Sequence, residues 1–264
     1  MTTKPVVVGA DGSPQSLRAV EWAASEARRH GAPLRIISVP VLPPRMRPDI
    51  SSTRTVADVI RDESAAWLDA AVARSKEIAP ELPLDTSLLS GAPAQVLTDC
   101  GVGALMLVVG ASSTSGLASM LLGSVSRYVA QHATCPVVVV GQEKSTGHRK
   151  VAVGVSDRHD AAATLAFAFD EAALRQADLL VIHSSADEEV PAWLTDWYEK
   201  YPGVTVSQQV CQGHPARVLA SHSASADLLV IGRHGAPHPA DVGGIQRAVL
   251  SHARGPVAVV PAED

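Results

Sequence analysis

The chain of 264 residues contains few aromatic residues. Hydrophobic residues make up 46% of the sequence but aromatic residues only 3%, so the core must be built from Val, Leu, Ile and Ala. Such a core favours parallel strands that helices bury on both faces. The composition therefore indicates a fold of the α/β class.

The chain also lacks an excess of basic charge and a long apolar run. Its formal net charge is -5 and its isoelectric point is about 6.0. Binding to a nucleic-acid backbone needs a basic stripe or patch, so we expect no nucleic-acid partner. No apolar run approaches the roughly 18 residues of a membrane helix. We expect a soluble, cytoplasmic protein that does not contact a membrane.

Cysteine is scarce as well. Cys100, Cys135 and Cys211 are scattered and include no C-x-x-C pair. An odd number of cysteines without paired spacing is typical of reduced thiols rather than of a disulfide framework or a zinc site. We expect no metal site.

One stretch of the chain occurs twice. Segment 91–97 reads Gly-Ala-Pro-Ala-Gln-Val-Leu, and segment 213–219, 122 positions later, reads Gly-His-Pro-Ala-Arg-Val-Leu. Each copy continues into an apolar run that ends in Gly110 or Gly232. A whole structural unit is therefore repeated. This predicts two domains, residues 1–143 and 149–264, joined by a polar linker.

Strands and helices alternate along the first half. Strands are expected from residue 6 and at 34–39, 84–89, 105–109 and 136–140, and helices at 16–30, 58–78, 92–99 and 123–132. The Asp-Gly-Ser sequence at 11–13 can form a turn and cap the first helix, which Gly31 ends. Alternation with short loops predicts right-handed crossovers and a parallel sheet in each half.

The second half repeats this order with altered spacing. The opening strands match at an offset of 145 and the later elements at 122, so 23 residues are missing from the connector after the second strand. The last elements match at 120, which removes two more residues between Gly232 and Gly243. The copies therefore diverged in that connector and in the glycine-containing loop.

That loop has features of an anion site. Gly110 ends a buried strand, small residues follow, and Gly123 opens a helix that begins Ser124, Val125, Ser126. Backbone N–H groups and a partly positive helix start can hold phosphates, and open α/β sheets bind ligands beyond the carboxyl ends of their strands. The alternative is a glycine turn with a serine cap and no ligand.

Together these motifs closely resemble the universal stress protein family. They are Asp-Gly-Ser after the first strand, Gly-x-Pro-Ala-x-Val-Leu, the glycine loop into segment 122–126, and segment 132–139 with its counterpart in the second half. The resemblance implies two tandem open parallel five-stranded sheets flanked by helices, a Rossmann-like fold that binds adenine nucleotides. It also implies ATP as the ligand in many members, with or without Mg²⁺ bound through the phosphates, and domains that pair through their fifth strands.

In the ATP-binding members the loop reads Gly, two residues, Gly, nine residues, Gly, then Ser or Thr. This chain has Ser113 where the second glycine is expected. By resemblance Asp11 contacts the adenine and Val39 lines it, although Asp11 can also be a plain turn residue. The implied binding residues of the first half are Asp11, Val39, Gly110, Ser113, Gly123, Ser124, Val125 and Ser126.

The second half departs from this pattern. It keeps Gly232 and Gly235, but only seven residues precede Gly243, and Gly244 replaces the hydroxyl residue. Asp157 is displaced by one position relative to Asp11. The resemblance therefore implies a weaker second site at Gly232, Gly235, Gly243 and Gly244.

Three functions remain open. The first is a nucleotide-binding regulator of a stress or dormancy response, read by an unidentified protein partner. The second is a nucleotide-free interaction scaffold with decayed sites, and the third is a slow ATPase. The sequence has no Walker motif and no acid pair near the loop, so we expect no catalytic residues and no dedicated enzyme. A homodimer is compatible with the sequence.

Two pairs of residues recur without an obvious chemical role. Trp67 and Trp193 both lie in the second helix of their half, and we expect them to pack in the core or between domains rather than against a ligand. His132 and His252 lie near the end of the fourth helix, where an imidazole is favoured at the helix C-terminus.

Overall fold

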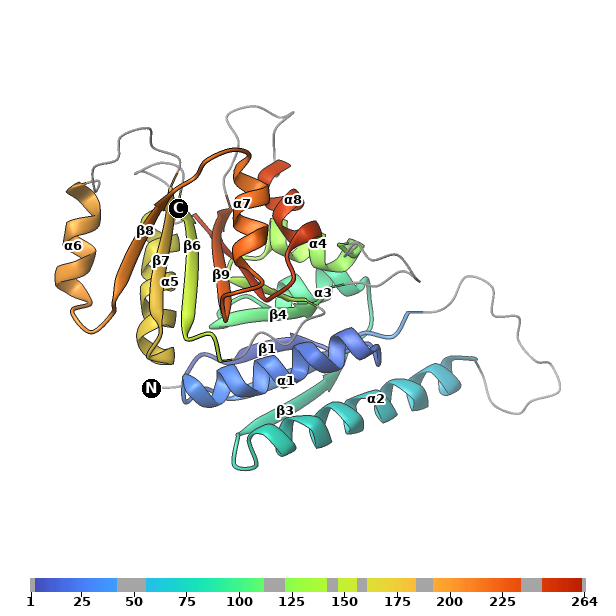
Figure 1. The fold of residues 1–264 in the computed structure, drawn as a ribbon. Helices are drawn as coiled ribbons and strands as arrows, with labels where there is room; N and C mark the ends of the chain where they lie inside the picture. Colours follow the sequence, from blue (N-terminus) through green and yellow to red (C-terminus); the bar gives the residue numbers. More distant parts are fainter. Residues whose placement is uncertain are drawn as a thin grey trace. The chain divides into compact units, whose positions relative to one another are not determined.

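The computed structural model describes residues 3–41, 56–111, 122–141, 147–155, 161–183, 192–233 and 244–262. Strands and helices alternate along the chain (Figure 1), so the predicted α/β fold is confirmed. The contacts divide the described residues into two compact units. The first runs to residue 110 and includes 124–135, and the second contains the rest. The boundaries at 143 and 149, which mark where the repeated copies end and begin, stay a prediction.

The first unit contains four strands of the sheet in the order β3-β2-β1-β4, and every neighbouring pair among them is parallel. Val8 lies in the middle and pairs with Ile36 on one side and Val108 on the other. Its elements are β1 (Val6–Gly9), α1 (Pro14–Arg29), β2 (Leu34–Ser38), α2 (Val56–Ile78), β3 (Leu84–Leu88), α3 (Pro93–Cys100), β4 (Met106–Gly110) and α4 (Ser124–His132).

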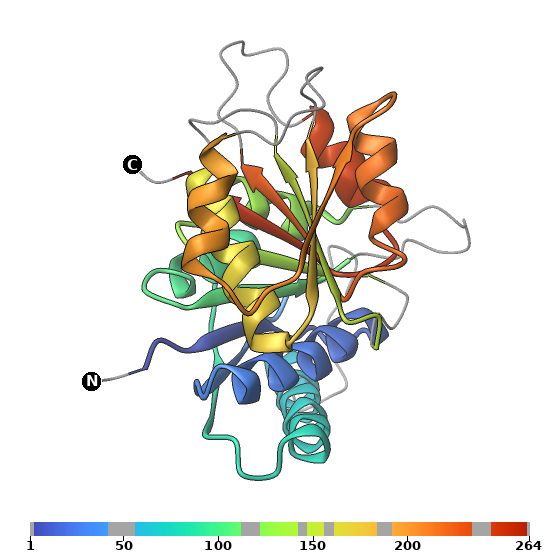
Figure 2. The same ribbon diagram turned by 60° about the vertical axis from the view of Figure 1, so that its left-hand side comes forward.

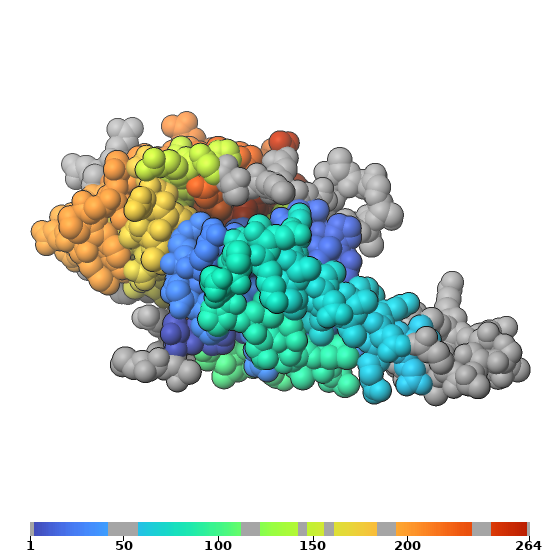
Figure 3. Space-filling view, turned by 90° about the horizontal axis from the view of Figure 1, so that it is seen from below, coloured from blue at the N-terminus to red at the C-terminus, as the bar shows by residue number. Residues whose placement is uncertain are grey.

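Helices cover the first sheet in pairs. α1 packs against α2, and α3 packs against α4 (Figure 1). The small buried side chains of α1, Ala23, Ala24 and Ala27, allow this close approach. The outer side of α2 forms part of the surface in Figure 3. β1 and β4 are apolar over almost their whole length because both faces are covered, as parallel strands require.

The second unit has six strands in the order β5-β10-β9-β6-β7-β8. Figure 2 shows α5 and α6 on one side of these strands and α7 and α8 on the other. Its elements are β5 (Val137–Val140), β6 (Lys150–Val155), α5 (Ala162–Arg175), β7 (Asp178–His183), α6 (Ala192–Lys200), β8 (Val206–Val210), α7 (Pro215–His222), β9 (Leu228–Arg233), α8 (Gly244–His252) and β10 (Val257–Pro261).

All neighbours in this second sheet are parallel except β5 and β10. These two strands run antiparallel, with Ala258 opposite Val138. The fifth strands of the two copies therefore pair, as the sequence led us to expect. Because β5 belongs to the first copy of the repeat and pairs with the last strand of the second copy, the contacts place it with the second unit.

One packing contact is shared by both copies. A Cβ added to Gly9, at the end of β1, would lie 2.9 Å from Leu97 Cδ1 of α3. At the equivalent Gly154 it would lie 2.6 Å from Leu219 Cδ2 of α7. The leucine of the repeated Gly-x-Pro-Ala-x-Val-Leu segment therefore packs directly on a glycine of the central strand in each copy.

Two expectations from composition can also be compared with the structure. Cys100, Cys135 and Cys211 are free thiols, as expected. Among the helices in the described ranges, none is both long enough and apolar enough to cross a membrane.

Candidate functional site

The candidate site lies at the carboxyl edge of the first sheet. From β1 the strand order continues through β2 to β3 on one side, and β4 lies on the other side of β1. The strand order therefore reverses between β1 and β4, and open α/β sheets bind ligands at such a topological switch point. Ala10 N donates to Ile37 O at 2.8 Å and extends the pairing of β1 with β2. Asp11 therefore follows the central strand, Val39 follows β2 and Gly110 ends β4. The structure brings these three residues to one edge.

Asp11 belongs to a tight turn, as predicted. Its Oδ1 accepts a hydrogen bond from Ser13 N at 3.0 Å, and Gly12 between them has a φ of 78°. Ser13 caps α1, because its Oγ accepts from Ser16 N at 3.1 Å. Ser16 Oγ donates back to Ser13 O at 2.9 Å. The turn fixes the backbone of Asp11 while its carboxylate stays exposed to solvent.

Trp67 of α2 lies against this turn. A Cβ added to Gly12 would lie 2.5 Å from both Cδ1 and Nε1 of the indole ring, so the ring occupies the space beside the glycine. Trp67 is half-buried. The sequence led us to expect packing for Trp67, but not its position beside Asp11. No local signal links residues 12 and 67, because the contact depends on how α2 packs on α1.

Gly110 is a glycine for a packing reason. An added Cβ would lie 2.7 Å from Gln15 O and 3.1 Å from Ser16 N, in the first turn of α1. Any larger residue would push α1 away from the end of β4. The close backbone neighbour of Gly110 is therefore the start of α1, and phosphate binding at this glycine stays a prediction.

The first turn of α4 is attached to Gly110. Ser126 is 4% exposed, and its Oγ donates to Gly110 O at 2.8 Å. A hydroxyl has one hydrogen to donate, so in this geometry the side chain of Ser126 positions the helix and its hydroxyl does not donate to an anion. Ser124, at the first position of α4, is exposed, and Val125 is half-buried. The first N–H groups of a helix have no intrahelical acceptor, so they stay available at this edge.

Of the remaining binding residues predicted in the first half, two are described by the structure and one is not. Val39 is half-buried and Gly123, which directly precedes α4, is also half-buried. Ser113 lies outside the described residues.

The second unit repeats only part of this arrangement in its described residues. Gly232 is buried in β9, opposite Val260 of β10. Gly244 is the exposed first residue of α8 and has no side chain where Ser124 has a hydroxyl. Gly235, Gly243 and Asp157 fall outside the described ranges.

The recurring histidines have a structural role. His132 Nδ1 lies 2.8 Å from Tyr128 O, and His252 Nδ1 lies 2.8 Å from Ala248 O. Since a carbonyl only accepts, each imidazole donates to the last turn of its own helix. The expected role at the helix C-terminus is confirmed.

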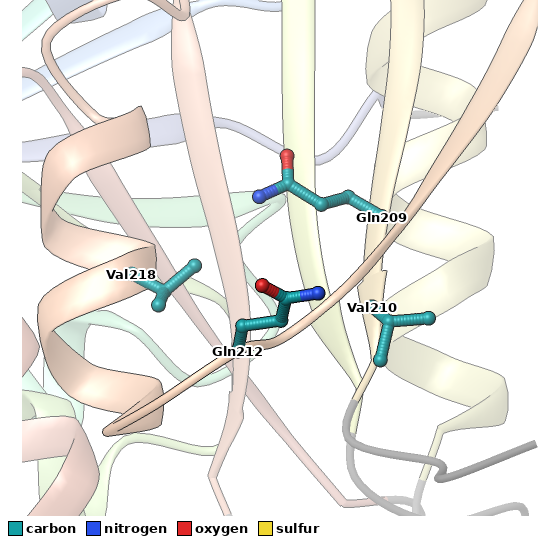
Figure 4. Close-up of a pocket in the computed structure, with 4 residues that line it drawn as sticks. All are labelled: Gln209, Val210, Gln212 and Val218. Atoms are coloured by element: carbon teal, nitrogen blue, oxygen red, sulfur yellow. The ribbon is translucent and has the colours of Figure 1, made fainter. Parts of the chain in front are cut away.

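A separate cavity of about 540 Å³ lies in the second unit, between the end of β8 and α7 (Figure 4). The residues that line it are Gln209, Val210, Gln212 and Val218. No motif in the sequence indicated it.

These features define a class: an α/β protein with a parallel sheet in which a capped turn, a close-packed glycine and a helix start meet at the switch point. Comparison with known proteins gives the family. The model of the universal stress protein family matches residues 2–141 and 196–261. The chain belongs to the universal stress protein family.

Individual relatives support this assignment along the whole chain. Universal stress protein Rv2005c from Mycobacterium tuberculosis is 32% identical over 96% of this chain and 96% of its own. Universal stress protein Rv2623 from the same organism is 30% identical over 96% of this chain and 95% of its own. The crystal structure of a universal stress protein from Archaeoglobus fulgidus has the same fold, with a TM-score of 0.76 and 18% identity over 99% of this chain and 97% of that chain.

Proposed function

We propose that the protein is a nucleotide-binding regulator that holds ATP at the carboxyl edge of the first sheet. The observation that carries this proposal is the meeting of Asp11, Val39 and Gly110 at the ends of three adjacent strands, beside the first turn of α4. The membership in the universal stress protein family supports it, because the family resemblance implies ATP binding in many members.

The chemistry of the edge suits the two ends of ATP. The exposed Asp11 carboxylate can accept from the amino group of adenine, and the half-buried Val39 offers an apolar surface to the ring. The positive end of the α4 dipole, its free N–H groups and the exposed Ser124 suit the phosphates. Mg²⁺, where present, binds through the phosphates. Ser113 stays part of the proposed phosphate loop.

The two copies contribute unequally to this function. We expect the second unit to bind nucleotide more weakly, because Gly244 offers no hydroxyl where Ser124 does. Occupancy of the first site is proposed to be read by a protein partner in the cytoplasm. The proposal is for binding and regulation, without a dedicated catalytic step.

Ligand identification on gently purified, denatured protein tests this proposal. We expect mass spectrometry to find adenine nucleotide in the wild type and in Gly244→Val, and to find it lost from Gly123→Val. Thermal unfolding of Gly123→Val without added ligand checks that the variant is folded. Added ATP should raise the melting temperature of the wild type, because a ligand that binds only the folded state stabilises it.

Each alternative function has its own outcome. Absence of bound nucleotide together with no thermal shift at millimolar ATP would reject the regulator in favour of the scaffold. Phosphate release faster than that of Gly123→Val would support the slow ATPase instead.

A further inference from the structure

The indole of Trp67 lies face-on against the turn that carries Asp11. A Cβ added to Gly12 would lie 2.5 Å from both Cδ1 and Nε1 of the ring and 2.6 Å from Cε2. If the ring approached along its N–H bond, Nε1 would be clearly nearer than its two ring neighbours. The nearly equal distances therefore mean that Gly12 lies against the face of the ring, and that the indole N–H does not point at the turn.

This contact falls on the residue of the turn that has the greatest backbone freedom. Glycine can adopt the widest range of φ and ψ, and Gly12 has a φ of 78°, which residues with a side chain rarely adopt. The indole fills the space beside Gly12, so it limits the conformations that the turn can reach. Trp67 is itself held in place by the packing of α2 on α1.

The conformation of the turn sets the direction of the Asp11 carboxylate. Its Oδ1 accepts from Ser13 N at 3.0 Å, and this bond requires the backbone to stay folded at Gly12 between them. Asp11 N donates to Ser16 Oγ at 3.3 Å. Among the described residues Oδ2 has no hydrogen-bond partner. With Oδ1 held by the turn, Oδ2 is the oxygen that can accept from a ligand.

The second copy lacks the glycine that this contact requires. At the offset of 145, Asp157 stands where the first copy has Gly12. An indole could not lie as close to a residue with a side chain, because the Cβ would overlap the ring. The pair of Gly12 and Trp67 is therefore a property of the first copy, which is also the copy with the proposed nucleotide site.

We propose that Trp67 is a positioning residue of the first site: its ring holds the turn at Gly12 and thereby directs the Asp11 carboxylate toward the ligand. The proposal rests on the proposed function for the identity of the ligand, whereas the contact between ring and turn does not depend on a ligand. It gives α2 a role in binding as well as in packing. The base and the phosphates then depend on different helices, α2 and α4.

The first test separates these two ends of the ligand by calorimetric titration of the full chain with ATP and with inorganic triphosphate, which has no base. Trp67→Ala should weaken ATP binding at least about tenfold, as expected when a hydrogen bond to a charged group is lost, and leave triphosphate binding unchanged. Trp67→Phe keeps an aromatic face against Gly12 and should restore most of the ATP affinity. Trp197→Ala, which removes another half-buried tryptophan, is the matched control and should change neither affinity.

The second test needs no ligand. Hydrogen exchange of the Ser13 amide, followed by NMR, reports on its bond to Asp11 Oδ1. We expect faster exchange in Trp67→Ala than in the wild type, and the wild-type rate in Trp67→Phe and in Trp197→Ala. The amide of Ala23, which is buried in the middle of α1, should keep its rate in all variants. This comparison separates a loosened turn from a loss of overall stability.

Three results would overturn the proposal. The first is an unchanged exchange rate of the Ser13 amide in Trp67→Ala. The second is an unchanged ATP affinity in that variant, and the third is equal weakening of ATP and triphosphate. If the wild type binds neither compound, the regulator is rejected, and the exchange rates alone decide whether Trp67 holds the turn. The two proposals therefore fail separately.

Discussion

The second helices of the two copies, α2 and α6, differ in length and in the side chains through which they pack. α2 runs for 23 residues and α6 for 9 in the described chain, and the two helices end at equivalent positions, 78 and 200. The long helix packs on α1. Small residues are buried here: Ser75 in α2, Ala79 directly after it and Ala24 in α1. At the equivalent places the second unit has Trp197, Tyr201 and Phe169.

These three aromatic side chains form a cluster. The ring centroid of Phe169 lies 5.5 Å from that of Trp197 and 5.0 Å from that of Tyr201, and all three rings are stacked. Aromatic side chains bury large areas, so a few of them can replace several turns of helix. A shortened copy of a fold can therefore keep its core by exchanging helix length for side-chain size. In a chain with 3% aromatic residues, this concentration of rings is informative.

Removing the fully buried ring of the cluster should have the largest effect. Phe169→Ala installs the residue of the first copy on α5, but without a long partner helix to fill the space. Phe169 is 0% exposed, so we expect a loss of about 3–5 kcal/mol in the free energy of unfolding, measured by urea denaturation. Leu174→Ala on the same helix, 42% exposed, is the control and should cost within about 0.5 kcal/mol. Equal costs for the two variants would show that the rings do not replace helix length.

The extra length of α2 also reaches the candidate site. At the offset of 122, Trp67 corresponds to position 189, which lies before the described part of α6. Trp193, the tryptophan of the second copy, stands four positions further along, and its side chain is outside the described part of the structure. Gly12→Ala should lower the free energy of unfolding by about 1–3 kcal/mol, because it adds backbone strain at positive φ and a clash with the indole.

A double-mutant cycle separates these two causes. In the double variant, Trp67→Ala removes the clash with the Cβ added by Gly12→Ala, and only the backbone strain remains. We expect a coupling free energy between the two substitutions of about 0.5–3 kcal/mol. Gly31→Ala is the matched control, since its φ is 59° and an added Cβ has no neighbour within 4 Å. If Gly12→Ala costs no more than Gly31→Ala, the contact between α2 and the turn contributes nothing.

The features that could be predicted from the sequence are those that depend on residues close together along the chain. The cap at Ser13, the apolar strands and the order of elements follow from neighbours along the chain, and the pairing of the fifth strands follows from the family resemblance. The contact between Trp67 and Gly12, the bond from Ser126 to Gly110 O and the aromatic cluster join distant elements. No periodicity or spacing records such contacts, because they depend on how helices pack. The packing role of Ser126 was missed for the same reason, and its role in binding stays a prediction.

The smallest expected effect concerns pH and the third member of the aromatic cluster. Burial, and then the hydrogen bond of 2.7 Å from Tyr201 Oη to Asp170 Oδ1, raise the pKa of Tyr201 to about 12. A pKa raised above the ordinary value of about 10 means that this contribution to stability is complete below pH 10 and is lost as the pH rises toward 12. The urea midpoint of the wild type should therefore fall more steeply between pH 9 and pH 11.5 than that of Tyr201→Phe, which has no phenol to ionise. Ala79, the counterpart in the first unit, cannot titrate, so the effect belongs to the second copy alone. Parallel pH profiles for the two proteins would mean that the phenol of Tyr201 is as free to ionise in the folded state as in the unfolded chain.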